Sequence, residues 1–414
     1  MCSGRCRYDS GFDEWIRHFM VTQSDPSAIA TTERPMRVCF VSQLAWGVFA
    51  PDSNARFGGA ESQMHGLAVA LAKDPAFEVS FVLQDFGQPR ELVIDGVRVI
   101  RYSRPFKGSR ALKSLRWLSV GVSSFTRVWG ADADVYVESP AGFPTFHCVA
   151  VARLRRRATL FAIASDGDLQ REPPDVVAAH EAALERRVFL WAMPRATTIT
   201  ALSEYQRAEL KRQFGRDSVI IPNAFPIPEA PPTVEKDAVL WVASSQELKQ
   251  PWLFLDLAEA YPTERFVMVM PSNDVSLFER IQKRAQTLPN LVFVESVPFT
   301  EIQSFFDRAK VFVNTSTVEG FPNTFVQSAM AATPVLSLQV NPDDILDRGG
   351  FGRCADGDFE RLRSDLEELL ADDGLRSRMG AAGYAYARER HDIDVVIAQF
   401  KEVLQRTVRR ASSG

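Results

Sequence analysis

Residues 311–338 read VFVNTSTVEGFPNTFVQSAMAATPVLSL and decide the fold. They begin with a run of branched apolar residues, continue through a polar loop and a short helical stretch, and end in a second apolar run. That order of strand, loop, helix and strand is typical of a parallel α/β sheet. The loop carries the only charge of the stretch, Glu319, and Gly320 after it allows the backbone to approach a ligand closely.

The helix in this stretch predicts an anion site. Asn323 is a favourable N-cap, so we expect the helix to begin there. The free N–H groups and the positive dipole end of a helix N-terminus suit a diphosphate. Gln327 follows one turn later, and its amide is expected to reach the same cleft and bond hydroxyl groups. The residue types alone are equally consistent with a solvated Glu319 and a surface Gln327.

Strands and helices alternate through the rest of the chain. Residues 37–42 form a candidate buried strand, followed by a glycine-containing loop and a helix over 61–73. Further candidate strands are residues 79–83, 97–102, 135–137, 159–164, 197–202, 239–242, 266–270 and 291–294. The pattern predicts two doubly wound α/β domains, which bind ligands at the carboxyl ends of their strands.

A proline-rich segment separates the two halves. Five prolines between residues 222 and 232, followed by charged residues, favour an extended linker. A single core rarely exceeds roughly 250 to 300 residues, so a chain of 414 residues is expected to form two domains. We place them at 36–228 and 229–392. Residues 1–35 are expected to be a poorly ordered extension, and 393–414 a helix and tail that pack on either domain, including back on the first.

Composition excludes several classes of protein. With 46% hydrophobic and 24% charged residues the chain is neither fibrous nor disordered. Its five cysteines are scattered without metal-binding spacing, which is typical of a reduced cytosolic protein and predicts no metal site. No apolar stretch approaches the ~20 residues of a membrane-spanning helix. We therefore expect a cytoplasmic protein with at most peripheral membrane contact, and no nucleic-acid partner.

The net charge of −4 conceals a basic region. Residues 101–160 hold eleven Lys or Arg and three Asp or Glu. Most of this charge lies in residues 107–116 and 153–157, so we expect one face of the N-terminal half to be basic. Docking on an anionic lipid surface, at ~1 kcal/mol for each basic residue near it, is one interpretation. A solvated helix face is the other.

The segment quoted first resembles the E-x7-E signature of retaining glycosyltransferases of family 4, which have the GT-B fold of two Rossmann-like domains. The resemblance extends from residue 36 to about 391. It implies that Glu319 contacts the donor sugar and that Gln327, which stands where the signature has its second acid, binds the nucleotide ribose. It also implies that the loop amides hold donor oxygens, at Gly320, Phe321, Asn323 and Thr324.

Two further family motifs have counterparts. Gly58 and Gly59 match a loop that in the family lies against the donor phosphates, although two glycines before a helix alone indicate only a tight turn. Lys249 matches a lysine that neutralises the diphosphate, and the resemblance implies that it acts in catalysis with Glu319. Ser244 replaces the family's arginine, which removes charge-assisted bonds worth ~1.5 to 3 kcal/mol each.

Other acidic residues are weaker candidates. Asp166 and Asp168 follow the strand over 159–164, so they either bind acceptor hydroxyls or form an ordinary turn. Glu138 is the polar residue nearest the place where many family members have a histidine, and is a further acceptor candidate. Asp132 and Asp134 have the D-x-D form of some metal sites but precede a strand, so we expect them to lie away from the cleft.

Together these features predict hexosyl transfer from a nucleoside-diphosphate sugar to a glycan or lipid-linked acceptor. The resemblance implies retention of configuration, no metal or cofactor, and a role in cell-surface polysaccharide or glycolipid synthesis. Two alternatives stay open: a nucleotide-sugar epimerase, and an inactive relative that serves as a binding partner, which the replacements at Ser244 and Gln327 motivate. A dinucleotide-dependent dehydrogenase is disfavoured because no G-x-G-x-x-G follows the first strand.

Overall fold

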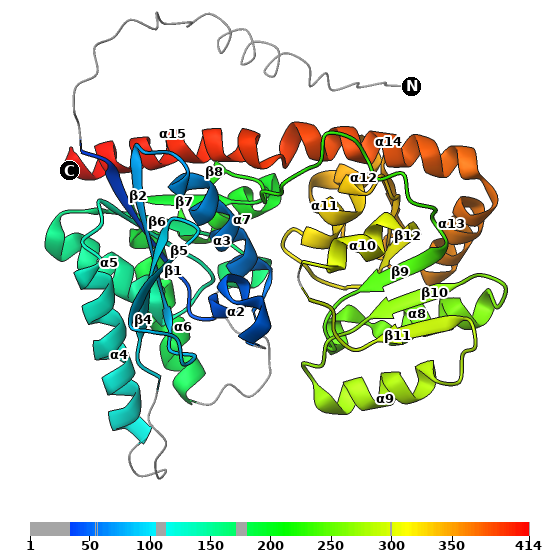
Figure 1. The fold of residues 1–414 in the computed structure, drawn as a ribbon, viewed down its shortest axis with the longest axis horizontal. Coiled ribbons are helices and arrows are strands. Elements are labelled where there is room, and N and C mark those ends of the chain that lie inside the picture. The colour runs from blue at the N-terminus through cyan, green and yellow to red at the C-terminus, as the bar shows by residue number, and fades with distance from the viewer. Residues whose placement is uncertain are drawn as a thin grey trace, which may run out of the picture. The chain divides into compact units, whose positions relative to one another are not determined.

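The computed structural model describes residues 34–53, 55, 57–104, 113–170, 180–298 and 300–413. Residues 36–414 form one compact unit built on two sheets, one of eight strands and one of six. We call the first sheet with its helices the N-lobe and the second the C-lobe (Figure 1). The two parallel α/β layers confirm the predicted fold class.

The N-lobe sheet has the strand order β3-β4-β2-β1-β5-β6-β7-β8. Every pair is parallel except the edge pair of β3 and β4. The strands are β1 (Met36–Val41), β2 (Phe77–Gln84), β3 (Glu91–Ile94), β4 (Val97–Tyr102), β5 (Val135–Glu138), β6 (Ala158–Ala162), β7 (Thr198–Ala201) and β8 (Val219–Ile220). Their helices are α2 (Trp46–Phe49), α3 (Gly59–Ala72), α4 (Lys113–Gly130), α5 (Phe143–Arg155), α6 (His180–Ala192) and α7 (Glu204–Phe214).

The C-lobe sheet is parallel throughout, in the order β11-β10-β9-β12-β13-β14. Its strands are β9 (Ala238–Val242), β10 (Phe266–Val269), β11 (Leu291–Val294), β12 (Ala309–Asn314), β13 (Val335–Ser337) and β14 (Gly352–Cys354). The helices are α8 (Pro251–Ala260), α9 (Val275–Ala285), α10 (Ile302–Asp307), α11 (Asn323–Met330), α12 (Ile345–Arg348), α13 (Phe359–Ala371) and α14 (Asp373–Arg390).

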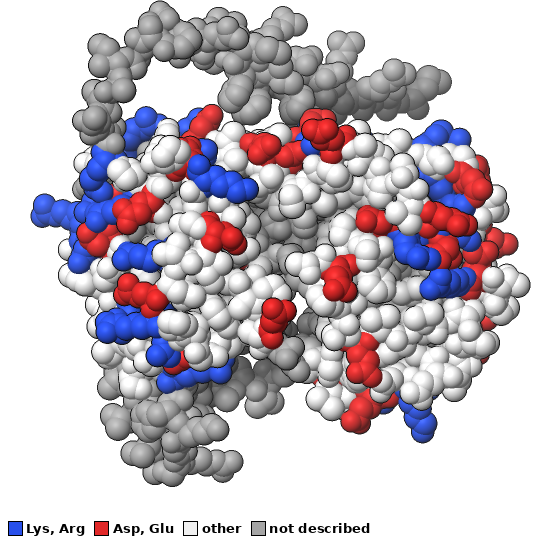
Figure 2. All heavy atoms as spheres, in the orientation of Figure 1, with Lys and Arg blue, Asp and Glu red and all other residues white. Residues whose placement is uncertain are grey.

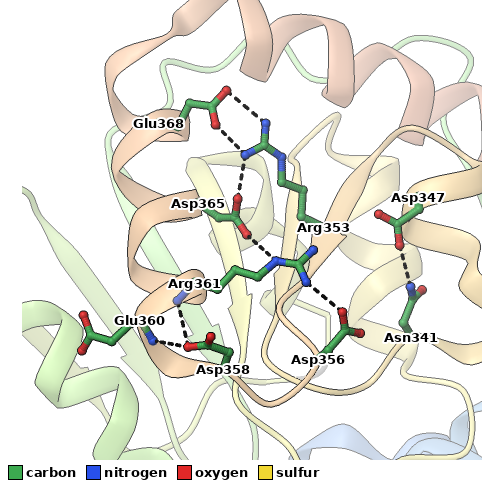
Figure 3. Close-up of polar contacts among 9 residues, drawn as sticks. All are labelled: Asn341, Asp347, Arg353, Asp356, Asp358, Glu360, Arg361, Asp365 and Glu368. Carbon is green, nitrogen blue, oxygen red and sulfur yellow. Dashed lines mark hydrogen bonds and ion pairs between the residues drawn. The ribbon is translucent and has the colours of Figure 1, made fainter.

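An ion-pair network fixes α13 beside the edge strand β14 (Figure 3). Arg353 on β14 donates to Asp365 and Glu368 on α13, each at 2.7 Å. Arg361 on the same helix donates to Asp356, just after β14, at 2.8 Å. Partly exposed pairs contribute little individually, so the network orients the helix more than it stabilises the lobe.

The last helix, α15 (Ile393–Ser412), returns to the N-lobe. Its apolar face joins the core cluster that contains Val38 and Phe40, through Val396, Phe400 and Leu404. Thr407 Oγ1 also donates to Thr198 Oγ1 on β7 at 2.8 Å, and Lys401 pairs with Asp74 at 2.6 Å. The C-terminal helix therefore completes the N-lobe core.

We predict that Leu404→Ala lowers the free energy of unfolding by about 2 to 5 kcal/mol, because it leaves a cavity in a fully buried cluster. Val395→Ala is the matched control, since Val395 lies on the same helix and is 37% exposed. That change should stay within about 0.5 kcal/mol. Urea denaturation of both variants measures the difference, and equal effects would contradict the packing described for α15.

Candidate active site

A cavity of about 960 Å³ lies where strands of both sheets end. Its walls come from the loops after β1, β5 and β6 in the N-lobe and after β9 and β12 in the C-lobe. This is the position at which open parallel sheets bind ligands. Of the predicted donor residues, the cavity is lined by Gly58, Gly59, Ser244, Lys249, Glu319, Gly320, Phe321, Asn323 and Thr324.

Lys249 and Glu319 meet on the C-lobe wall. The ammonium group of Lys249 pairs with Glu319 Oε1, and both side chains are largely shielded, at 14% and 20% exposure. Ser316 Oγ donates to the same carboxylate oxygen at 2.8 Å. Thr315 Oγ1 donates to the Lys249 carbonyl at 2.6 Å, which ties the loop after β9 to the loop after β12. The pair is thus held in place from both loops.

Asn323 is the first residue of α11 rather than its N-cap, a position that Pro322 occupies. Asn323 does not have the expected capping role. Its side-chain Oδ1 instead accepts a hydrogen bond from Asn223 Nδ2 at 2.8 Å. The side-chain Nδ2 of Asn323 is close to the N-lobe, because a Cβ added at Gly59 would lie 2.7 Å from it. The backbone N–H groups of Asn323 and Thr324 bond no residue that the structure describes, so the first turn of α11 presents free donors to the cavity.

Gly320 lies directly against the loop after β6. A Cβ there would come within 3.0 Å of Ala164 O, Ser165 Cα and Gln206 Nε2. A side chain would need the N-lobe loop to shift by a few tenths of an ångström, so the position favours glycine. The Glu319-Gly320 segment therefore bridges the C-lobe wall and the N-lobe wall of the cavity.

Comparison with known families agrees with this geometry. Residues 57–227 match the family model described as Glycosyltransferase Family 4, and residues 236–372 match the one described as Glycosyl transferases group 1. The two models follow each other along most of the chain. The chain belongs to the GT-B glycosyltransferases.

Three proteins similar to this chain share little sequence identity with it. The capsular polysaccharide biosynthesis glycosyltransferase CapM of Staphylococcus aureus is 26% identical over 128 residues, which are 30% of this chain and a third of that relative. Sucrose-phosphate synthase from Thermosynechococcus elongatus is 16% identical, with a TM-score of 0.71 over 90% of this chain and 98% of that one. TarM of S. aureus, in a complex with UDP, is 13% identical, with a TM-score of 0.57 over 69% and 58% of the two chains. At these identities the two structures show the fold alone.

Four predicted residues of the glycosyltransferase do not line the cavity: Glu138, Asp166, Asp168 and Gln327. The carboxylate of Asp168 turns inward and accepts from the amides of Ala164 and Ser165 at 2.9 and 3.1 Å, and burial raises its pKa to about 6. Asp166 accepts from Gln206 Nε2 at 2.9 Å, and burial raises the pKa of this carboxyl group too. Gln327 is 9% exposed, because the helix residues from 325 to 330 are all packed.

Glu138 is also buried rather than presented to an acceptor. Its Oε2 accepts from Thr145 Oγ1 at 2.7 Å, while Oε1 has no partner among the described residues. Burial raises its pKa well above the usual range. The position at the end of β5 was recognisable from the sequence, but its inward direction depends on the packing of α5. The acceptor role expected for Glu138 therefore has no contact to support it.

The D-x-D segment lies away from the cavity and serves the fold. Asp132 pairs with Arg37 and Arg155, and Asp134 pairs with Arg157 at 2.9 Å. Two arginines of the expected basic face are thus bound to acids. On the face in Figure 2, Lys and Arg are interspersed with Asp and Glu over both lobes. Residues 105–112, which hold much of the other basic cluster, lie outside the described residues, so lipid docking stays a prediction there.

The cavity residues that the sequence analysis did not name as site residues include Gln63, Arg186 and Asn223. Gln63 Oε1 accepts from the Ala224 amide at 2.6 Å, and Asn223 bonds Asn323, so both secure the N-lobe wall. Arg186 lies on a helix without any motif, and nothing in its sequence context marks it. The described residues contain no group of three or more side chains suited to a metal ion, and no helix long and apolar enough to cross a membrane.

We predict that Glu138→Gln stabilises the protein relative to the wild type by an amount that grows with pH. The folded-state pKa of Glu138 is raised, so its contribution is fully present below the unfolded pKa of about 4.3 and is lost as the pH rises toward the folded value. Glutamine does not ionise and escapes this loss. Urea unfolding at pH 4 and pH 8 measures the two differences. Glu91→Gln, at an exposed residue of β3, is the control, and a pH-independent effect of Glu138→Gln would contradict the prediction.

Proposed function

We propose that the chain transfers a hexosyl group from a nucleoside-diphosphate sugar to a saccharide or lipid-linked acceptor, with retained configuration and without a metal or cofactor. The observation that carries the proposal is the Lys249–Glu319 pair in a cavity that also receives the free amides of α11. A cation, a carboxylate and a helix N-terminus at one place suit a sugar diphosphate, which is anionic at one end and rich in hydroxyl groups at the other.

The proposed roles follow from these contacts. The amides of Asn323 and Thr324 and the ammonium group of Lys249 bind the diphosphate and stabilise the charge that develops on it as the sugar leaves. Glu319 then accepts from hydroxyl groups of the donor sugar. The Ser244 hydroxyl, which accepts from Gln246 Nε2 at 2.8 Å, keeps its proton to donate to a phosphate oxygen. It is a neutral donor where the family has a charged one.

The biological setting is proposed from the relatives. CapM is named for capsular polysaccharide biosynthesis, which supports an acceptor in polysaccharide synthesis. TarM was solved with UDP, which supports a uridine nucleotide as the first donor to test. Cys39, Cys148 and Cys354 are free and buried, which suits a reducing compartment and supports work in the cytoplasm, with peripheral contact at the inner face of the membrane.

A second candidate is an inactive relative that binds partners in a polysaccharide assembly. It is favoured by Ser244 and by the position of Gln327, which lies outside the cavity. A screen of nucleoside-diphosphate sugars by calorimetry, with slow donor hydrolysis as a second readout, separates the two. Binding and hydrolysis of any donor support the transferase, whereas no binding by the whole panel would leave the inactive relative.

We predict that Glu319→Gln lowers kcat for transfer or donor hydrolysis by at least about a hundredfold, because positioned electrostatic contacts contribute at this scale. Lys249→Met should instead weaken nucleoside-diphosphate binding by about ten- to a hundredfold, through loss of one charge-assisted bond.

The matched control is Glu247→Gln. Glu247 lies two residues before Lys249, but its side chain is 62% exposed and pairs with Arg280 outside the cavity. Steady-state kinetics and UDP titration of the three variants provide the test. Full activity in Glu319→Gln, or equal effects of all three changes, would contradict the site.

A further inference from the structure

Arg186 places a cation in the N-lobe wall of the cavity, near the Asp168 carboxyl group. Among the residues that the structure describes, four charged side chains line the cavity: Glu61, Arg186, Lys249 and Glu319. Lys249 and Glu319 neutralise each other, and Glu61 Oε2 accepts from the Gly58 amide at the start of α3. No carboxylate among the described residues lies within ion-pair distance of Arg186, because the nearby Asp168 carboxylate turns to the amides of Ala164 and Ser165. The guanidinium group can therefore still form a direct ion pair with an anion of the ligand.

The guanidinium group of Arg186 is fixed before any ligand arrives. Nη2 donates to the carbonyls of Gly167 and Asp168 at 3.1 and 3.3 Å, and the group lies over the Phe189 ring at 5.2 Å. Nε is buried, whereas Nη1 donates to no described residue and is not buried. Burial lowers the pKa of Arg186, and the nearby Asp168 carboxylate offsets part of this effect. A cation that is already held in place and has one free edge loses little conformational entropy when it binds an anion.

A hydroxyl donor lies on the same turn. Ser165 Oγ accepts from the Gly167 amide at 3.1 Å, so its proton remains available to a ligand, and Ser165 lines the cavity. Ser139, at the end of the neighbouring strand β5, also lines it. One guanidinium edge with hydroxyl groups beside it suits the tetrahedrally arranged oxygens of a phosphoryl group.

The order of the strands in the N-lobe sheet separates Arg186 from the proposed diphosphate site. The first turn of α11 lies against Gly59, which follows β1, whereas Arg186 holds the turn that follows β6. Strand β5 lies between β1 and β6, so the two loops leave strands that are not neighbours in the sheet. Glu319 and Gly320, against Ala164, lie between them. The order along the cavity is diphosphate, donor sugar, Arg186.

We propose that Arg186 binds a phosphoryl group of the acceptor, so that the acceptor is a phosphorylated saccharide or a lipid-linked saccharide with its diphosphate. This inference rests on the proposed function for the order of the subsites, but the anion site itself does not require catalysis. A lipid-linked diphosphate and a free sugar phosphate share the chemistry that Arg186 recognises.

The test is a titration of inorganic phosphate into the protein saturated with UDP, followed by 31P NMR line broadening. UDP fills the donor site, so phosphate reports on the second one. We expect saturable binding to the wild type and at least about tenfold weaker binding to Arg186→Gln, from the loss of a charge-assisted bond. Arg186→Lys should retain most of the binding, which shows that loss in Arg186→Gln is not a folding defect.

Two controls sharpen the result. Arg187→Gln changes the next residue of α6, which is exposed and outside the cavity, and should bind phosphate as the wild type does. If UDP does not bind, the proposed function fails, and the phosphate titration is repeated in Lys249→Gln without UDP, where dependence on Arg186 still tests the inference. No saturable binding to the wild type, or equal binding in Arg186→Gln and the wild type, would overturn it.

Matched ligands identify the acceptor class. Glucose 6-phosphate against glucose tests a sugar phosphate, and geranyl diphosphate against geraniol tests a lipid diphosphate, each in the wild type and in Arg186→Gln. A preference for either phosphorylated partner that disappears in Arg186→Gln supports the proposal and names the source. Glucuronate binding that depends on Arg186, with no effect of the phosphorylated partners, would overturn the phosphoryl assignment.

Discussion

The ion pair between Lys249 and Glu319 depends on which strands are neighbours in the C-lobe. Strands β9 and β12 pair in parallel at the centre of the sheet, so the loops after them leave the same edge together. Lys249 comes from the first loop and Glu319 from the second, and Thr315 fastens one to the other. A parallel sheet thus brings two residues 70 positions apart into one contact.

Hydrogen bonds also connect the cavity to the segments through which the chain passes from one lobe to the other. Asn223 donates to Asn323 at the start of α11, and its carbonyl accepts from His391 Nδ1 at 2.7 Å. His391 is buried, which lowers its pKa to about 4, so the ring is neutral at physiological pH and Nδ1 carries the proton for this bond. Next to them, Phe225 pairs with Asp392 where α15 leaves the C-lobe. These contacts connect the crossing between the lobes directly to the first turn of α11.

Sequence periodicity predicted the long, buried strands, but it missed the short strands and the exposed edge strand. The sequence pattern missed β8 and β14 because two or three residues carry no period, and β3 because it is an exposed edge strand. Motif spacing named Glu319, Lys249 and the glycines, which the structure places at the cavity because their loops follow from strand order. Asp168 and Gln327 lie outside the cavity, because their direction depends on local amides and helix packing. No sequence pattern indicated Arg186, which reaches the cavity through the tertiary arrangement of α6.

The electrostatics of the cavity explain how Ser244 can stand where an arginine is usual. Without a ligand, Lys249 and Glu319 form a nearly neutral pair, so Lys249 is not left as an isolated half-buried cation, which would be costly. In the proposed function, a diphosphate that binds Lys249 would release Glu319 toward the sugar, so one event would prepare both ends of the donor. A second cation at position 244 would hold the diphosphate more tightly before and after transfer alike, and uniform binding of this kind does not raise kcat. On this proposal the serine weakens donor affinity while the Lys249–Glu319 pair stays intact.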